Sequence, residues 1–135
     1  PKVYRMLKPG GTVALFWNKP SAGENDPLHV ELQKFYQKIG WTRQVENDQQ
    51  RYQKRIDTIL KYGFADLRLK LFHATREFSA EDYIHLLNTY SDHRSLQETE
   101  RIKLEQDIKS AIMDFGNVMH IYDTMELYLA RKPLH

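Results

Sequence analysis

The chain has 135 residues, a length typical of one domain with a single core. It has no cysteine, which excludes disulfides, thiolate catalysis and cysteine-built metal sites, and which is typical of proteins in a reducing cytoplasm. Twenty Lys and Arg residues against eighteen Asp and Glu residues give a formal net charge of +2, with the signs interspersed. This pattern argues against a nucleic-acid partner, which usually requires a clustered basic stripe. No apolar run reaches the roughly eighteen residues of a membrane span, so we expect a cytoplasmic protein without membrane contact.

The first predicted elements are a helix end and a strand. Residues 2–7 have apolar side chains at helical spacing, and Pro9 and Gly10 then stop the helix. Residues 12–17 are apolar on both faces of the pleat. Strands covered on both sides have this pattern, as parallel strands do in α/β proteins, so we expect a central, buried strand here.

Two helices and a long strand are predicted next. Asp26 followed by Pro27 is a strong helix start, with a side-chain acceptor at the N-cap and a preset backbone angle after it. A second helix, with Arg51, Lys54 and Arg55 expected on a solvated face, stops at Gly63. The strand that follows, residues 67–78, changes the phase of its apolar residues, which predicts a bulge near 71–72.

The last third of the chain predicts two more helices and a closing strand. Ser79 and Asp82 resemble a capping box that opens the first helix. The second helix places one apolar stripe inward, with Phe115 as its last member. Residues 118–130 are predicted to form a long, mostly buried strand. One of its faces contains Met119, Ile121, Met125, Leu127 and Leu129, and the other contains His120, Tyr122 and Tyr128. The element order predicts an α/β fold with three strands.

Residues 7–12 have the sequence Leu-Lys-Pro-Gly-Gly-Thr and lead into the apolar residues 13–18. This segment resembles the turn and fifth strand of class I S-adenosylmethionine-dependent methyltransferases. The resemblance continues through the helix end before the sixth strand, a helical insert of the small-molecule branch, and the seventh strand, at residues 61–64, 78–84 with 89–93, and 122–132 respectively.

The resemblance implies that residues 1–135 are the C-terminal half of a Rossmann-like class I methyltransferase fold. The expected sheet is a three-stranded mixed sheet in the family order five, seven, six, with a helical insert at about residues 79–116. The family holds its cofactor over a glycine-rich turn that follows a strand. This chain has no G-x-G motif, and Gly10 and Gly11 precede a strand instead. We therefore expect S-adenosylmethionine to be bound mainly by an N-terminal half that this chain lacks, with no cofactor-binding residue here.

The activity implied by the resemblance is methyl transfer to a small-molecule acceptor by a longer parent protein, with the isolated chain inactive. Two alternatives remain open: a non-catalytic protein-interaction module, and a nucleic-acid methyltransferase. A glycine-rich turn in the residues upstream would favour the enzyme. We also expect the edge of the strand at residues 12–17 to meet another polypeptide, either a second copy or the N-terminal half.

Four residues are candidates for acceptor binding. Trp17 and Asn18 are predicted to end the first strand at its carboxyl edge, where α/β sheets bind ligands. Tyr83 and Tyr90 lie on a helix predicted to cap that edge, and aromatic faces attract cations. The alternative is a structural role for each: Trp17 in the core, Asn18 in a turn, and both tyrosines in packing.

One histidine is a candidate base, and no metal site is predicted. His93 follows Asp92, so a carboxylate is available to orient the imidazole, although an ordinary surface pair explains the sequence equally. Glu81 and His85 have the spacing of two metal ligands on one helix face, but a third ligand with a recognisable spacing is absent from the sequence.

Overall fold

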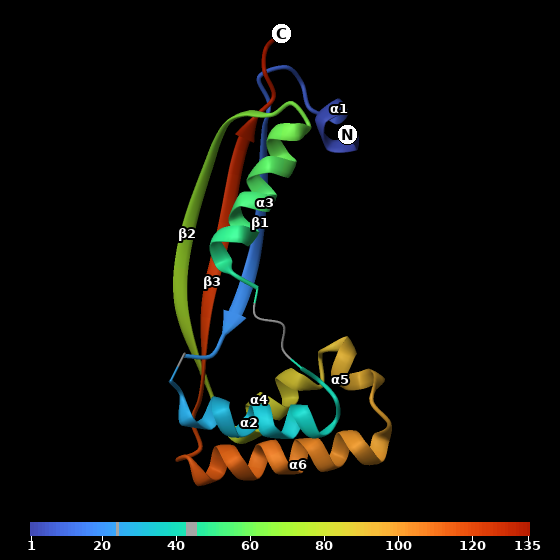
Figure 1. The fold of residues 1–135 in the computed structure, drawn as a ribbon, viewed down its shortest axis with the longest axis vertical. Helices are drawn as coiled ribbons and strands as arrows, with labels where there is room; N and C mark the ends of the chain where they lie inside the picture. Colours follow the sequence, from blue (N-terminus) through green and yellow to red (C-terminus); the bar gives the residue numbers. More distant parts are fainter. Residues whose placement is uncertain (24, 43–45) are drawn as a thin grey trace. The chain divides into compact units, whose positions relative to one another are not determined.

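The computed structural model describes residues 1–23, 25–42 and 46–135, and it has the predicted α/β architecture (Figure 1). A short helix, α5, is the one described element that the sequence did not predict separately. In chain order the elements are α1 (Lys2–Met6), β1 (Thr12–Ser21), α2 (Pro27–Lys38), α3 (Asp48–Lys61), β2 (Ala65–Phe78), α4 (Ala80–Leu87), α5 (Ser91–Ser95), α6 (Glu98–Asp114) and β3 (Met119–Arg131).

The three strands form one sheet in the order β1-β3-β2, as predicted. Backbone hydrogen bonds join the start of β1 to the end of β3: the Gly10 amide donates to the Lys132 carbonyl, and the Lys132 amide donates to the Gly11 carbonyl, both at 2.8 Å. Side-chain contacts from β2 to β3 also run in opposite chain directions, from His73 to Thr124 and from Glu77 to His120. Both neighbouring pairs are therefore antiparallel, so the sheet of the described residues is antiparallel and the expected mixed sheet is corrected.

The chain divides into two compact units. Unit 1 comprises Pro1–Lys19, Gln44–His73 and Thr124–His135, and unit 2 comprises Pro20–Arg43 and Ala74–Asp123. Each unit contains part of every strand, so each is built on its own stretch of sheet.

Unit 1 is built around helix α3, which lies along β1 and β3 (Figure 1). The helix begins at Asn47, whose side chain accepts hydrogen bonds from the amides of Gln49 and Gln50. Its inward face adds Ile59 to a small apolar core, which is completed by Val13, Phe64, Tyr128 and Ala130.

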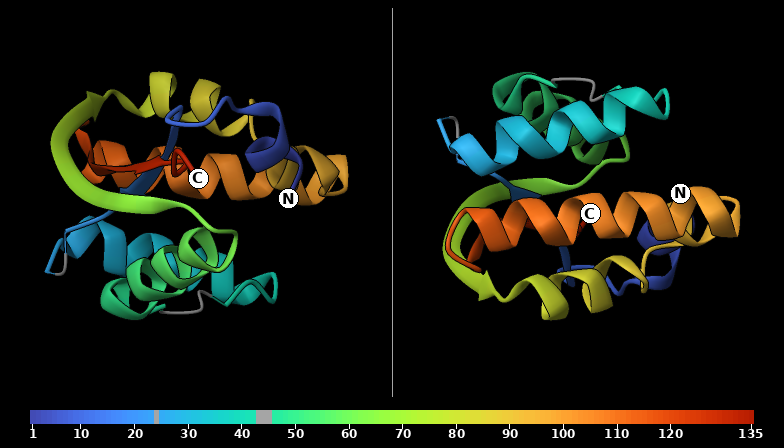
Figure 2. Two further views of the ribbon diagram at one scale, coloured as in Figure 1. Left: turned by 90° about the horizontal axis from the view of Figure 1, so that it is seen from above. Right: turned by 90° about the horizontal axis from the view of Figure 1, so that it is seen from below.

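Unit 2 has the larger apolar core. Helix α6 lies between α2 and α4 and packs against both (Figure 2). The predicted N-caps are confirmed: Asp26 accepts from the Leu28 amide at 3.0 Å, and Ser79 accepts from the Asp82 amide at 3.1 Å. The core contains Leu28, Leu32, Ala80, Tyr83, Leu87, Leu104, Ile108, Ala111, Ile112, Met119 and Ile121.

The apolar pattern of residues 12–17 predicted a central strand covered on both faces, which is wrong for this chain, whereas the sheet order expected from the resemblance places the strand at an edge and is confirmed. β1 lies at an edge of the sheet, and Phe16 is 76% exposed while Val13 is buried. The strand also runs to Ser21 and does not end at Trp17 or Asn18. One face is covered by the packing of α3, and the described chain supplies no neighbour along the outer edge.

The predicted burial of Phe115 needs correction, and β3 has a burial pattern that changes along its length. Phe115 is half-exposed because α6 ends at Asp114 and Phe115 is its C-cap. On β3, the buried residues change phase after Asp123, so the side chains of Glu126, Tyr128 and Ala130 are buried and those of Met125, Leu127 and Leu129 are not. The change occurs where β3 passes from unit 2 to unit 1, because the two units cover different pleat positions.

The predicted phase change on β2 is confirmed. Leu67 and Leu69 are half-buried in the first part of the strand, and Arg76 and Phe78 in the last part. The predicted bulge near residues 71–72 stays a prediction.

Candidate functional site

A cavity of about 410 Å³ lies within unit 2, and aromatic side chains form much of its wall. We call it the aromatic cavity. Its aromatic residues come from three separate segments: the end of α2 and the residues after it, helix α4, and the start of α5. They are Tyr36, Trp41, Tyr83, Tyr90 and His93.

His93 is held at both ring nitrogens. Its Nε2 lies 3.1 Å from the Tyr36 hydroxyl, and its Nδ1 lies 3.1 Å from Asp92 Oδ1. The same Asp92 oxygen accepts a hydrogen bond from the His93 backbone amide at 2.8 Å. The side chain is almost fully buried, with 5% of the residue exposed. His93 is therefore fixed in orientation between a phenol and a carboxylate.

Three aromatic rings surround the His93 imidazole. The rings of Trp41 and Tyr36 meet it edge-on, with centroids at 5.3 and 5.7 Å, and the Tyr90 ring lies 6.2 Å away. Trp41 and Tyr36 are themselves stacked, with ring planes 3° apart. Such geometries are favourable for aromatic pairs beyond the area that they bury. The imidazole is therefore packed among three aromatic rings in the wall of the cavity.

Burial and neighbouring groups set the protonation of this cluster. Burial raises the pKa of Tyr36 well above its ordinary value, and Tyr83 and Asp92 add to the effect. Burial, followed by the neighbouring Tyr90, raises the pKa of Tyr83 to about 12. Burial opposes ionisation of Asp92, but hydrogen bonds from the His93 side chain and backbone outweigh it and lower the Asp92 pKa. At neutral pH the cavity therefore contains neutral phenols and one carboxylate.

The chemistry available to this cluster follows from its hydrogen bonds. A carboxylate only accepts, so the contact with Asp92 requires a proton on Nδ1 of His93. In the neutral ring, Nε2 is then the acceptor, and the Tyr36 hydroxyl donates to it. This arrangement can take up a proton at Nε2 and stabilise the resulting imidazolium through Asp92.

Three of the predicted site residues line one cavity of unit 2, and the other two belong to unit 1. Tyr83, Tyr90 and His93 line the aromatic cavity. Trp17 lines a different cavity, of about 360 Å³, within unit 1, where the Arg55 guanidinium lies 4.1 Å from the centre of its ring. Asn18 is exposed in the middle of β1. The predicted strand-end position of Trp17 and Asn18 is wrong because β1 extends to Ser21.

Sequence reasoning missed two residues of the aromatic cavity, Tyr36 and Trp41. Tyr36 shares the apolar face of α2 with Leu28 and Leu32, so its spacing predicts core packing and says nothing of its hydroxyl. Trp41 follows Gly40, beyond the periodic part of the helix. Their contacts with His93 arise only in the folded unit.

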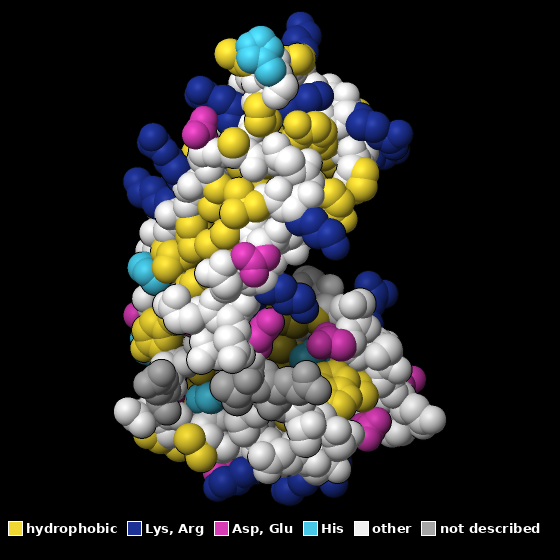
Figure 3. Space-filling view, turned by 45° about the horizontal axis from the view of Figure 1, so that its top comes forward, with side chains coloured by type: hydrophobic (Ala, Val, Ile, Leu, Met, Phe, Trp, Pro, Cys, Tyr) yellow, Lys and Arg dark blue, Asp and Glu magenta, His cyan; other side chains and the backbone are white. Residues whose placement is uncertain are grey.

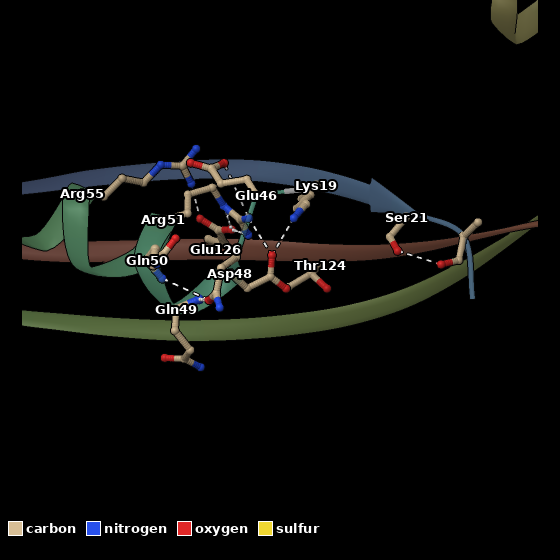
Figure 4. A network of polar contacts seen from close by, with 12 residues as sticks. Lys19, Ser21, Glu46, Asp48, Gln49, Gln50, Arg51, Arg55, Thr124 and Glu126 are labelled. Atoms are coloured by element: carbon tan, nitrogen blue, oxygen red, sulfur yellow. Dashed lines mark hydrogen bonds and ion pairs between the residues drawn. The ribbon is translucent and has the colours of Figure 1, made fainter. Parts of the chain in front are cut away.

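A buried network of charges occupies unit 1 (Figure 4). Glu126 is fully buried, and its Oε1 accepts from Nε and Nη2 of Arg51 at 3.0 and 2.5 Å. Its Oε2 accepts from Arg55 and from the Tyr128 hydroxyl. Arg51 also donates to Asp48 at 2.6 Å. The prediction that this helix face is solvated is therefore wrong for Arg51, which is buried and bound by Glu126 on the central strand β3.

Three further observations bear on cofactors, metals and membranes. Gly10 has a positive φ of 77° and lies in the turn before β1, where its amide donates to the Lys132 carbonyl. Among the described residues, no group of three or more His, Asp and Glu side chains is placed to hold a metal ion. No helix in the described ranges is long and apolar enough to cross a membrane.

The fold is α/β and unit 2 contains the aromatic cavity. Comparison with known proteins shows what the chain is similar to. No family model matches the chain. The chain is 30% identical over 111 residues to an uncharacterized methyltransferase of Schizosaccharomyces pombe, a match that covers 82% of this chain and 41% of the relative. The chain is thus related to methyltransferases, as the sequence predicted, and spans about two fifths of that relative's length.

Solved structures with weaker similarity include two methyltransferases. A proposed methyltransferase of Bacillus halodurans matches with a TM-score of 0.43 and 22% identity, over 98% of this chain and 60% of that one. A phosphoethanolamine N-methyltransferase of Haemonchus contortus matches with a TM-score of 0.34 and 16% identity, over 98% of this chain and 29% of that one. The relationship to methyltransferases rests on the sequence match.

Proposed function

We propose that this chain is the C-terminal, acceptor-binding part of a cytoplasmic methyltransferase that uses S-adenosylmethionine and acts on a small molecule. The observation that carries the proposal is the aromatic cavity, with His93 fixed between Tyr36 and Asp92 inside it. The match to a methyltransferase of which this chain covers 41% supports a longer parent protein. The expected helical insert at residues 79–116 would supply Tyr83, Tyr90 and His93.

When bound, S-adenosylmethionine supplies a methyl group that is already activated on a sulfonium. Positioning of the acceptor then dominates catalysis, and orientation of this kind is worth roughly 7 to 11 kcal/mol. The rings of Tyr83 and Tyr90 would hold the acceptor. A proton lost by the acceptor would pass to the Tyr36 hydroxyl as the Tyr36 proton moves to His93 Nε2.

Charge distribution gives no support to the nucleic-acid alternative. On the face drawn in Figure 3, Lys and Arg side chains are scattered among apolar and acidic ones and form no continuous band. Small molecules are the acceptor class that a cavity of about 410 Å³ accommodates.

A measurement of cofactor binding tests the proposal that the N-terminal part of the parent protein binds the cofactor and this chain binds the acceptor. We expect the 135-residue chain alone to show no binding of S-adenosylmethionine by calorimetry at concentrations up to about millimolar, because its sequence has no G-x-G turn after a strand. The parent protein should bind it with a dissociation constant in roughly the micromolar range. Micromolar binding by the isolated chain would refute the proposal that the cofactor site lies outside it.

The edge strand supports a second part of the proposal, that β1 pairs with another polypeptide. β1 lies at the sheet edge, and its apolar Phe16 is largely exposed. Unpaired edges with apolar side chains are templates for strand pairing, and burying one such side chain is worth about 1.5 to 3 kcal/mol. The partner would be the N-terminal half of the parent or, in its absence, a second copy.

Light scattering on the purified chain measures this association. We expect the chain to self-associate and the Phe16→Lys variant to associate less, because a charged side chain on an edge strand opposes strand pairing. Lys2→Glu, a charge change at an exposed position on α1, is the matched control and should leave the association intact. A monomer at every concentration, with β1 solvated, would contradict the expected pairing.

A further inference from the structure

The described wall of the aromatic cavity contains an acidic side chain and no Lys or Arg side chain. Of the described residues in its wall, one is a carboxylate, Asp92, and none is Lys or Arg. The other ionisable groups are tyrosines and the histidines His29, His93 and His120. A carboxylate or phosphate group on a ligand would find no guanidinium or ammonium partner among these residues, which is the usual means of binding such groups.

One carboxylate oxygen of Asp92 can contact a ligand. Its Oδ1 accepts from the His93 amide and lies 3.1 Å from Nδ1 of the His93 ring, whereas no hydrogen bond joins Oδ2 to another of the described residues. The Asp92 side chain is 64% exposed while its neighbour His93 is buried, so it stands at the open part of the wall. The hydrogen bonds from His93 also keep its pKa low, so it retains its negative charge.

The aromatic rings add attraction for the same kind of ligand. Tyr83, Tyr90 and Trp41 present π-systems to the cavity from separate segments, and Tyr90 remains partly exposed at 36%. Aromatic faces attract organic cations, and several rings with one carboxylate form a common site for ammonium groups. The aromatic rings and the Asp92 carboxylate therefore both favour a positively charged ligand.

We propose that the aromatic cavity binds an organic ammonium, that is, a protonated amine on an apolar or aromatic body, and that Asp92 selects it over acids. This inference rests on the proposed function, in which the amine is the methyl acceptor, and it names the class of that acceptor. Asp92 acts as the specificity-determining residue, and Tyr90 and Trp41 hold the apolar body.

Three probes of the same shape test the selection of charge: benzylammonium, benzyl alcohol and benzoate. Binding to the purified 135-residue chain is followed by side-chain NMR shifts of Trp41 and Tyr90 at pH 8, where free histidines are mostly neutral. We expect benzylammonium to bind roughly 5- to 10-fold more tightly than the alcohol, and benzoate to bind weakest.

Matched variants assign the preference to Asp92. Asp92→Asn should abolish the advantage of benzylammonium over benzyl alcohol while the alcohol still binds. Asp57→Asn makes the same charge change at an exposed position on α3 in unit 1 and should leave the preference unchanged. Circular dichroism of both variants would establish that they are folded.

Benzoate binding as tightly as benzylammonium, an unchanged preference in Asp92→Asn, or no binding of benzylammonium to the cavity would each overturn the inference. These measurements need neither the cofactor nor methyl transfer. If they fail while the parent protein binds S-adenosylmethionine, the acceptor class is wrong and the proposed function is unaffected. Failure of the parent to bind the cofactor would instead refute the proposed function.

Discussion

Replacing Glu126 by leucine should lower the free energy of unfolding by about 3 to 5 kcal/mol, because the substitution leaves two arginines without their carboxylate. Glu126 is fully buried on the central strand, and Arg51, which depends on it, is only 7% exposed. Removing one partner of a buried ion pair costs the full desolvation of the charges that remain. Urea denaturation followed by circular dichroism measures the change.

Two further variants distinguish this explanation from a general effect on the sheet. Glu77→Leu removes an exposed carboxylate from β2, and we expect a change within about 0.5 kcal/mol. Combining Arg51→Met and Arg55→Met with Glu126→Leu should recover much of the lost stability, because apolar replacements of a whole buried network are often tolerated. A Glu126→Leu variant as stable as Glu77→Leu would show that the network contributes little.

Replacing His93 by glutamine should lower turnover by the parent protein about 100-fold or more, because positioned acid–base groups contribute roughly 10² to 10⁴ in rate. Cofactor affinity should remain nearly unchanged, since the cavity and the cofactor site are separate in the proposal. Tyr90→Ala should impair acceptor turnover in the same selective way. Turnover is measured as formation of S-adenosylhomocysteine with a panel of small amines.

The matched control is His85→Gln on α4, an exposed histidine outside the aromatic cavity. Its turnover should equal that of the unmodified protein. Equal losses of turnover and cofactor affinity in His93→Gln would point to a structural role for His93. A His93→Gln variant as active as the His85→Gln control would show that the His93 imidazole takes no part in catalysis.

Local sequence features predicted the elements and their order well. The Asp26 and Ser79 caps, and the glycines that follow α2 and α3, act within a few residues and are visible in the sequence. The sheet order followed from the resemblance to methyltransferases. Burial was less predictable, because it depends on what covers each strand: the apolar pattern of β1 indicates two covered faces, and this chain covers one.

The candidate site was only partly predictable for the same reason. The adjacency of Asp92 and His93 is visible in the sequence, but their link to Tyr36 spans 57 residues and forms only in the folded unit. Likewise, Glu126 appears in the sequence as one of several polar residues in the last strand. Its partners lie on α3, about 70 residues earlier, so no local pattern indicates the buried network.

Transfer of an isotopically labelled methyl group from S-adenosylmethionine by the parent protein tests the central claim most directly. The proposal predicts that a small amine gains the label with an equal amount of S-adenosylhomocysteine formed, and that His93→Gln and Tyr90→Ala lose this transfer while His85→Gln keeps it. A parent protein that binds the cofactor but labels no small molecule, or whose transfer is unchanged in both cavity variants, would contradict the assignment of the aromatic cavity as the acceptor site.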